Sequence, residues 1–193
     1  MPALPEVETV CRGLAESLIG TQFVKVITRR PDLRFPLPND LGERLIDNRI
    51  IAVKRRAKFI LIEMKTSDVL VAHLGMSGRF RIYNTLPPPE EIHDHVIFET
   101  NSGAVIRYND PRRFGFFILT NRCNLATNRF LLDLGPEPLE HTFTPEVFIT
   151  NLKNKRTSMK TALLDQSIVA GIGNIYACEA LFMARLSPRR KTQ

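Results

Sequence analysis

The stretch MPALPEVETV (residues 1–10) opens the chain and predicts a helix that holds the N-terminus in place. Pro5 suits the first turn of a helix, where a missing N–H costs nothing. The residues that follow at helical spacing are apolar: Val7, Val10, Leu14 and Leu18. Glu6 and Glu8 complement the helix dipole in the first turn, and Gly20 is a stop signal. We therefore expect an anchored terminus rather than a loose tail.

Pro2 offers this terminus a reactive group. A small residue after the initiator Met invites removal of Met1, which leaves proline as a free secondary amine. An α-amino group has a pKa near ~8, against ~10.4 for a lysine side chain, so more of it is neutral at pH 7. A neutral amine attacks a sugar aldehyde carbon and forms a Schiff base. The alternative interpretation is that Pro2 merely follows Met, as in many proteins.

Short β-rich runs dominate the chain after this helix, and turn signals rich in Asn, Gly and Pro separate them. We expect strands over residues 22–28, 50–55, 59–64, 69–73, 79–83, 96–99, 104–107 and 116–120. The longest break, LPPPEE at residues 86–91, is typical of a surface loop. Many short strands without intervening helices predict an antiparallel sandwich or a flattened barrel.

The composition changes at LGPEP (residues 134–138), which predicts a boundary between a first domain, residues 1–133, and a second domain, residues 134–193. Helices are expected in the second domain from Thr144 to about Lys153, over Ser158–Asp165, and from near Asn174 to about Ala184. The predicted fold class is therefore α+β with two domains: an antiparallel β-sandwich with an N-terminal helix, then an all-α domain.

The charge of the 193-residue chain bears on its partners: 27 Lys and Arg against 20 Asp and Glu give a formal net charge of +7. Such an excess suits a polyanion, and it also suits an ordinary basic enzyme. No run approaches the ~18 apolar residues of a membrane span, and no basic and apolar leader precedes the first helix, so we expect a cytoplasmic protein. Cys11, Cys123 and Cys178 lie far apart, which indicates neither a metal site nor a disulfide framework.

Six stretches occur along the chain in one order: PALPEVET (2–9), RRAKF (55–59), HLGMSG (73–78), HDH (93–95), DPRRFG (110–115) and GIGNIYA (171–177). Together they resemble formamidopyrimidine-DNA glycosylase, the bacterial enzyme that removes oxidised purines from DNA. The resemblance covers essentially the whole chain, and residues 164–173 resemble the helix–two-turn–helix motif of that family. The chain departs from the N-terminal pattern at one position, because Ala3 stands where the family has a catalytic Glu.

The resemblance implies a DNA glycosylase of base-excision repair with coupled abasic-site lyase activity, in which Pro2 forms the Schiff base. Lys58, expected at the start of a strand, would bind the phosphate of the damaged nucleotide and assist proton transfer, and Glu6 would position Pro2. The family's Glu is a proton donor, a kind of help worth ~10²–10⁴-fold. Because Ala3 cannot transfer a proton, we expect poor release of oxidised purines such as 8-oxoguanine and formamidopyrimidines, and persistent action on abasic sites.

A base that leaves the duplex for catalysis leaves a hole behind it. The resemblance implies that Met76, Arg112 and Phe114 fill this hole, since apolar wedges support an unstacked step and Arg can bond the orphaned base. The alternative interpretation is a plain hairpin turn with a packed Met and a solvated arginine corner.

Four residues of the second domain carry groups suited to the DNA backbone: Lys155, Arg156, Lys160 and Asn174. The resemblance implies that the last two bind phosphates that flank the lesion, although such a charge run is also typical of a solvated helix face. His93 and His95 lie two residues apart and so share one face of a predicted strand. The resemblance assigns His93 to DNA; the alternative, a metal pair, has no apparent third ligand.

The family continues with further helices and a four-cysteine zinc finger that also binds DNA. No counterpart occurs in this sequence, so we expect a fragment or a shortened gene product without a cofactor. The expected partner is double-stranded DNA with oxidised purines or abasic sites, bound by a monomer that does not enter membranes. Two alternatives stay open: a non-catalytic binder of damaged DNA, and an unrelated β-sandwich.

Overall fold

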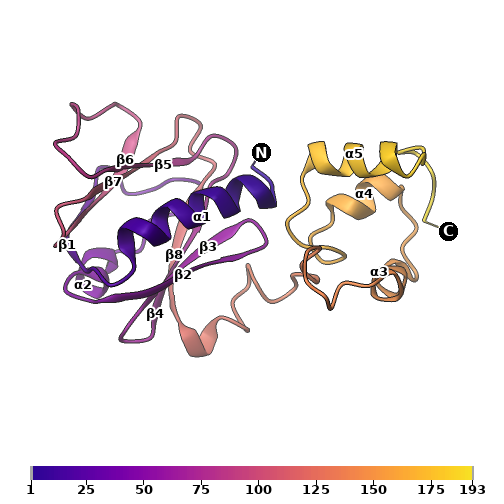
Figure 1. Cartoon of the computed structure of the whole chain (residues 1–193), viewed down its shortest axis with the longest axis horizontal. Helices are drawn as coiled ribbons and strands as arrows, with labels where there is room; N and C mark the ends of the chain where they lie inside the picture. The colour runs from indigo at the N-terminus through magenta and orange to yellow at the C-terminus, as the bar shows by residue number, and fades with distance from the viewer. Residues whose placement is uncertain (1, 193) are drawn as a thin grey trace.

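Helix α1 (Leu4–Leu18) closes one side of a β-sandwich in the computed structural model, which describes residues 2–192. The helix buries the apolar stripe predicted from its spacing, including Val7 and Leu14. Its main contacts are with β2 (Ile50–Arg56) and β5 (Arg79–Tyr83), which are edge strands of two different sheets. The helix therefore bridges the two sheets, as Figure 1 shows.

Two four-stranded antiparallel sheets form the sandwich. The first has the order β1-β6-β7-β5, with β1 (Phe23–Thr28), β6 (Asp94–Thr100) and β7 (Val105–Asn109) beside β5. The second has the order β2-β3-β4-β8, with β3 (Phe59–Met64), β4 (Asp68–His73) and β8 (Phe116–Asn121) beside β2. All eight predicted strands are present, with ends that move by at most two residues, so the predicted antiparallel sandwich is confirmed.

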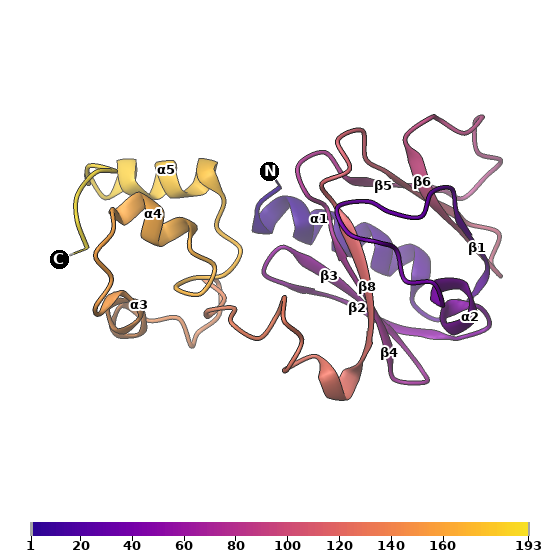
Figure 2. The same cartoon turned by 180° about the vertical axis from the view of Figure 1, so that it is seen from behind.

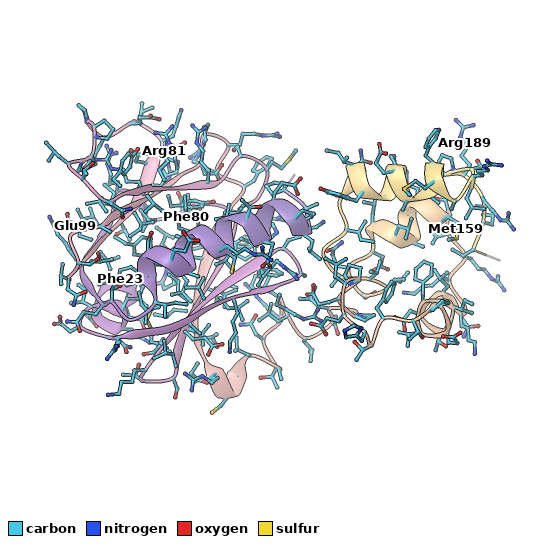
Figure 3. All side chains as sticks on the ribbon, viewed as in Figure 1. Phe23, Phe80, Arg81, Glu99, Met159 and Arg189 are labelled. Atoms are coloured by element: carbon cyan, nitrogen blue, oxygen red, sulfur yellow. The ribbon has the colours of Figure 1, made fainter. Side chains whose placement is uncertain are left out.

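Apolar side chains fill the space between the sheets and α1. Figure 3 shows Phe23 and Phe80 among them, and the ring of Phe23 lies 5.0 Å from that of Phe98 between centroids. Strand β3 is buried along its whole length. One of its faces meets this core, and the other meets a second apolar cluster that includes Phe116 and Ala170.

Helix α2 (Leu41–Leu45) has no counterpart among the predicted elements. Its five residues are too few to show a helical period in the sequence. Leu41 and Leu45 are both buried in the core, so tertiary packing stabilises this single turn.

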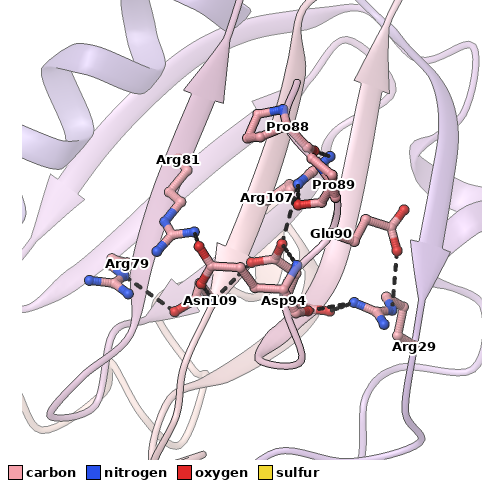
Figure 4. Close-up of polar contacts among 10 residues, drawn as sticks. Arg29, Arg79, Arg81, Pro88, Pro89, Glu90, Asp94, Arg107 and Asn109 are labelled. Atoms are coloured by element: carbon pink, nitrogen blue, oxygen red, sulfur yellow. Dashed lines mark hydrogen bonds and ion pairs between the residues drawn. The ribbon is translucent and has the colours of Figure 1, made fainter. Parts of the chain in front are cut away.

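The predicted surface loop at residues 86–91 is tied to the neighbouring sheet by arginine side chains (Figure 4). The buried Arg107 donates a hydrogen bond of 2.9 Å to the backbone carbonyl of Pro88. Its guanidinium also lies 3.4 Å from the fully buried carboxylate of Asp94. These contacts hold the start of β6 and, with it, the preceding residue His93.

Three helices form the second lobe, α3 (Pro145–Leu152), α4 (Met159–Leu164) and α5 (Asn174–Met183), as predicted. Thr144 caps α3 by accepting the N–H of Val147 at 3.3 Å, and Ser158 caps α4 by accepting the N–H of Thr161 at 3.2 Å. A 3₁₀ turn (Arg122–Asn124) and an irregular connection lead from β8 to this lobe (Figure 1). The division of the chain between residues 133 and 134 stays a prediction.

None of the helices in residues 2–192 has the length and apolar character that crossing a membrane requires.

The buried carboxylate of Glu137 joins the two lobes. It accepts the backbone N–H of Ala57 at 2.6 Å and the guanidinium of Arg56 at 2.9 Å, and it also pairs with Arg55. Burial by itself raises the pKa of Glu137, but the hydrogen bonds from Ala57, Arg55 and Arg56 outweigh it and hold that pKa below its ordinary value. The β2–β3 turn is thereby fastened to the segment that leads into the helices.

Candidate active site

The N-terminus lies at the end of α1 that faces the helical lobe (Figures 1 and 2). Pro2 is half-buried, and Ala3 is buried as the N-cap residue of α1. The N–H of Ala3 donates to Glu6 at 2.9 Å, so the Glu6 carboxylate holds the start of the helix. The N–H of Leu4 donates to the carbonyl of Gly171 at 3.0 Å, which ties this end of α1 to the helical lobe.

Lys58 lies in the turn between β2 and β3, so the prediction that it begins a strand is wrong by one residue. The tight turn places Ala57 at a φ of 52° and leaves Lys58 only 5% exposed. Within residues 2–192, the structure gives its ammonium no ion pair or hydrogen bond. Burial lowers the pKa of Lys58 to about 8. A buried cation without an anionic partner is a natural receptor for a phosphate.

Arg55 connects the surroundings of Lys58 to those of Pro2. Its guanidinium pairs with Glu8 of α1 at 2.9 Å and also with Glu137 at the junction of the lobes. The β2–β3 turn and the first turns of α1 are therefore held together. Both views place the two at the same end of the β lobe, next to the helices (Figures 1 and 2).

His73, the last residue of β4, is a neighbour of Lys58 that the sequence reasoning did not single out. Its ring stacks on Phe116 with centroids 5.0 Å apart. Burial, and then the charges of Lys58 and Arg34, lower the pKa of His73 to about 4, so the ring is neutral at pH 7. The sequence gives one signal that His73 lies near the site: it is the first residue of the HLGMSG stretch.

Two loops lie near His73 and its neighbour Phe116. The first, residues 74–77, follows β4, and the second, residues 110–114, connects β7 to β8. We call them the wedge loops. They touch through their backbones: Gly75 has a φ of +63°, and a Cβ there would lie 2.3 Å from the carbonyl carbon of Phe114. Met76 and Phe114 leave large apolar side chains 43% and 45% exposed. The guanidinium carbon of Arg112 lies 4.9 Å from the centre of the Phe114 ring. The structure thus brings the three predicted wedge residues together.

His93 adjoins the second wedge loop, because its carbonyl accepts the N–H of Asp110 at 3.1 Å. It precedes β6 by one residue, so the prediction that it lies in the strand is wrong, but its ring still lies beside that of His95, with centroids 6.1 Å apart. His95 is buried, and its Nε2 lies 2.9 Å from the carbonyl oxygen of Asp110. In residues 2–192 no group of three or more His, Cys, Asp or Glu side chains is placed to hold a metal ion.

The basic residues predicted to bind the DNA backbone all lie in the helical lobe. Lys155 pairs with Asp165 at 3.6 Å, so part of its charge is already compensated. Arg156 is exposed and Lys160 is half-buried on α4. Asn174 is exposed as the first residue of α5, where the N–H groups of a helix N-terminus favour anions.

Comparisons with known proteins give a consistent result. Residues 1–117 match the family model of the formamidopyrimidine-DNA glycosylase N-terminal domain, and residues 134–193 match that of the formamidopyrimidine-DNA glycosylase H2TH domain. The formamidopyrimidine-DNA glycosylase of Methylocella silvestris is 49% identical over 201 residues, which cover 99% of this chain and 69% of that protein. The corresponding protein of Nitrobacter winogradskyi is 48% identical, with 98% and 69% covered.

Solved structures of the Lactococcus lactis formamidopyrimidine-DNA glycosylase share this fold. One, bound non-covalently to DNA with an abasic site, has a TM-score of 0.90 at 31% identity and covers 98% of this chain and 72% of its own. Another, bound to DNA that contains N7-benzyl-Fapy-dG, has a TM-score of 0.90 at 32% identity, with 99% and 70% covered. The chain therefore belongs to the formamidopyrimidine-DNA glycosylase family of base-excision repair enzymes.

Proposed function

We propose that this chain acts on damaged double-stranded DNA through the imino nitrogen of Pro2, once Met1 has been removed. Met1 lies outside the described residues, so its removal stays a prediction. The observation that carries the proposal is that an ion pair between Arg55 and Glu8 holds the β2–β3 turn, which contains Lys58, against the first turns of α1, which Pro2 precedes. Lys58 is buried, and within residues 2–192 its ammonium has no ion pair or hydrogen bond. An amine and a cation that can hold a phosphate, brought to the same end of one lobe, are the groups that attack on a nucleotide sugar requires.

The reaction at Pro2 needs the amine, the open sugar aldehyde and one proton from solvent. The nitrogen lone pair forms the bond to C1′, and the aldehyde oxygen takes up the proton of the amine and one proton from solvent and leaves as water. The product is an iminium that draws electrons from the sugar. Lys58 would hold the phosphate of the damaged nucleotide, since an ammonium gains from an anion in a buried site. Glu6 would position the nucleophile through its hydrogen bond to the N–H of Ala3. We propose no cofactor for this step, because its atoms balance without one.

The wedge loops carry side chains that can fill the space a flipped nucleotide leaves in the duplex. Met76 and Phe114 are exposed apolar side chains, and Arg112 lies over the Phe114 ring where it could also bond the orphaned base. The contact of His93 with the second loop supports a role beside this wedge.

The helical lobe would hold the DNA backbone. Lys155, Arg156, Lys160 and Asn174 supply cations and a helix N-terminus, which are the groups that phosphates favour. The Lactococcus lactis relatives are bound to DNA with abasic or damaged sites, which supports the same partner for this chain. Because the relatives are bacterial repair proteins, we propose that it works as a monomer in the cytoplasm, where the chromosome lies.

Ala3 limits which part of the reaction this chain performs. It lacks the carboxyl that donates a proton as the deoxyribose ring opens, so release of oxidised purines should be slow. A pre-formed abasic site already samples the open aldehyde and should still react. The same substitution favours a second candidate function, a non-catalytic protein that binds damaged DNA.

Borohydride trapping distinguishes the two functions. A duplex with one abasic site is mixed with the protein, the iminium is reduced, and the covalent complex is weighed by intact mass. The expected result is an adduct in which the DNA is joined to a polypeptide that has lost Met1. Salt-sensitive binding of the duplex without any adduct would support the non-catalytic function instead.

The matched control is Pro2→Gln, whose larger second residue keeps Met1 in place and so caps the amine. This variant should bind the duplex but form no adduct. An adduct of undiminished yield from Pro2→Gln would show that another amine reacts and would overturn the role of Pro2.

A further inference from the structure

Asp110 is completely buried between the two wedge loops, and both of its carboxylate oxygens are occupied. One oxygen accepts the hydroxyl of Ser77, which belongs to the first loop. The other accepts the backbone N–H of Gly115 at 2.8 Å and the hydroxyl of Tyr108 at 3.3 Å. This single side chain therefore contacts the first wedge loop and residues that flank the second loop on both sides.

The backbone of Asp110 is engaged in the same way. Its N–H donates to the carbonyl of His93 at 3.1 Å, and its own carbonyl accepts the N–H of Arg113 at 3.2 Å. The His95 ring nitrogen lies 2.9 Å from the same carbonyl. Through its side chain and backbone, Asp110 therefore joins the first wedge loop, the second wedge loop and the start of β6.

Ser77 completes the connection from the other side. Its hydroxyl donates to Asp110 and accepts the backbone N–H of Arg112 at 3.2 Å. Arg112 is itself a wedge residue, and Ser77 directly follows another, Met76. One hydroxyl group thus joins the backbone of one wedge loop to that of the other.

The two wedge loops pack closely against each other and against Tyr108. A Cβ at Gly115 would lie 1.7 Å from the Tyr108 hydroxyl, and one at Gly75 would lie 2.3 Å from the carbonyl carbon of Phe114. Burial, followed by the charge of Asp110, raises the pKa of Tyr108, so its hydroxyl remains a donor to the carboxylate. Geometry and hydrogen bonding both support one rigid unit.

We propose that Asp110 and Ser77 lock the two wedge loops into a single body, so that Met76 enters the duplex together with Arg112 and Phe114. The proposal rests on the proposed function, in which those three side chains fill the space left by the flipped nucleotide. Asp110 and Ser77 act as positioning residues, because they act through the backbones of the loops. Folding has already ordered the loops, so inserting them into DNA loses less conformational entropy.

Ser77→Ala is the most direct perturbation. It leaves one oxygen of a buried carboxylate and the N–H of Arg112 without their partner, which frees the first loop from the second. Trapping of the duplex should fall more than trapping of a single strand. The wedge residues have to open the duplex, whereas a single strand has no partner base to replace. We expect the ratio of duplex to single-strand trapping to fall about tenfold, the change typical for a lost hydrogen bond to a charged group.

The experiment has two readouts. Borohydride trapping is measured against concentration for an abasic duplex and for the same abasic single strand. In parallel, 2-aminopurine placed opposite the abasic site reports wedge insertion by its fluorescence, and this signal does not depend on the reactivity of Pro2. Ser77→Ala should weaken or slow the fluorescence change, and Ser77→Thr, which keeps the hydroxyl, should restore it.

Ser102→Ala is the matched control. It likewise removes a hydroxyl of the β6–β7 turn that makes a hydrogen bond, here 2.9 Å from the hydroxyl of Thr100. This turn is at the opposite end of those strands from the wedge loops, so the trapping ratio and the fluorescence signal should stay at wild-type values. An unchanged ratio and an unchanged fluorescence phase for Ser77→Ala would overturn the coupling. An equal loss of trapping on the duplex and on the single strand would also overturn it, since it would indicate damage to the fold or to the site around Pro2 and Lys58. If no variant forms an adduct but the fluorescence of Ser77→Ala still falls, the coupling stands and the catalytic proposal fails.

Discussion

Replacing Lys58 with methionine should make the free protein more stable while weakening its reaction with DNA. The side chain of Lys58 is buried, its ammonium has no partner among the described residues, and its pKa falls from the ordinary 10.5 to about 8. Each pKa unit corresponds to about 1.4 kcal/mol, so keeping this group charged inside the fold costs up to about 3 kcal/mol. Methionine has a similar length and no charge, so Lys58→Met removes this penalty.

The pH dependence of this stability gain shows whether the charge of Lys58 causes it. Between pH 8 and pH 10.5 the unfolded chain still binds the proton that the folded protein has released, so the stability of the wild type rises with pH across this window. Below pH 8 both states are protonated and the penalty is fully present. The stability gained by Lys58→Met should therefore be greatest at pH 7 and should vanish toward pH 10.5.

Urea unfolding followed by circular dichroism measures this difference, with the free energy of unfolding extrapolated at a series of pH values from 7 to 10.5. Lys65→Met is the control, since Lys65 is exposed in the β3–β4 turn and should change stability by less than about 0.5 kcal/mol at every pH. Trapping of the abasic duplex should fall for Lys58→Met alone. A variant at position 58 that is less stable than wild type at pH 7, or a gain independent of pH, would refute the reasoning.

Three further substitutions test the missing carboxyl at position 3, the junction of the lobes and the wedge. In a protein shown by mass to lack Met1, Ala3→Glu should raise release of an oxidised purine by ~10²–10⁴-fold, measured as free base by chromatography, and no gain would contradict the assigned roles. Glu137→Gln should destabilise the fold by about 3 kcal/mol in urea unfolding, because Arg55 and Arg56 lose a buried carboxylate; a loss below about 1 kcal/mol would count against its part in joining the lobes. Met76→Ala should leave the melting temperature within about 2 °C of wild type, because the side chain is exposed, yet reduce trapping of abasic duplex more than of abasic single strand; equal reduction would argue against wedge insertion.

Much of the fold follows from patterns that act over a few residues. In residues 2–192, the eight strands and four of the five α-helices appear where alternation, spacing and caps predict them. Thr144 and Ser158, for example, each cap the helix that they open within its first turn. The fifth helix, α2, carries no such pattern. It depends on the burial of Leu41 and Leu45 by distant parts of the chain, which no short window of sequence contains.

The candidate site divides in the same way. The sequence by itself determined which groups are available: a proline behind the initiator Met, an alanine in place of a carboxyl, and two loops with apolar and basic residues. Only the tertiary structure decided that Lys58 is buried with no partner among residues 2–192 and that Asp110 joins the wedge loops. The physical reason is sequence distance. The contact of Ser77 with Asp110 spans 33 positions and that of Ala57 with Glu137 spans 80, so the electrostatics of the site exist only after the sheets and lobes have come together.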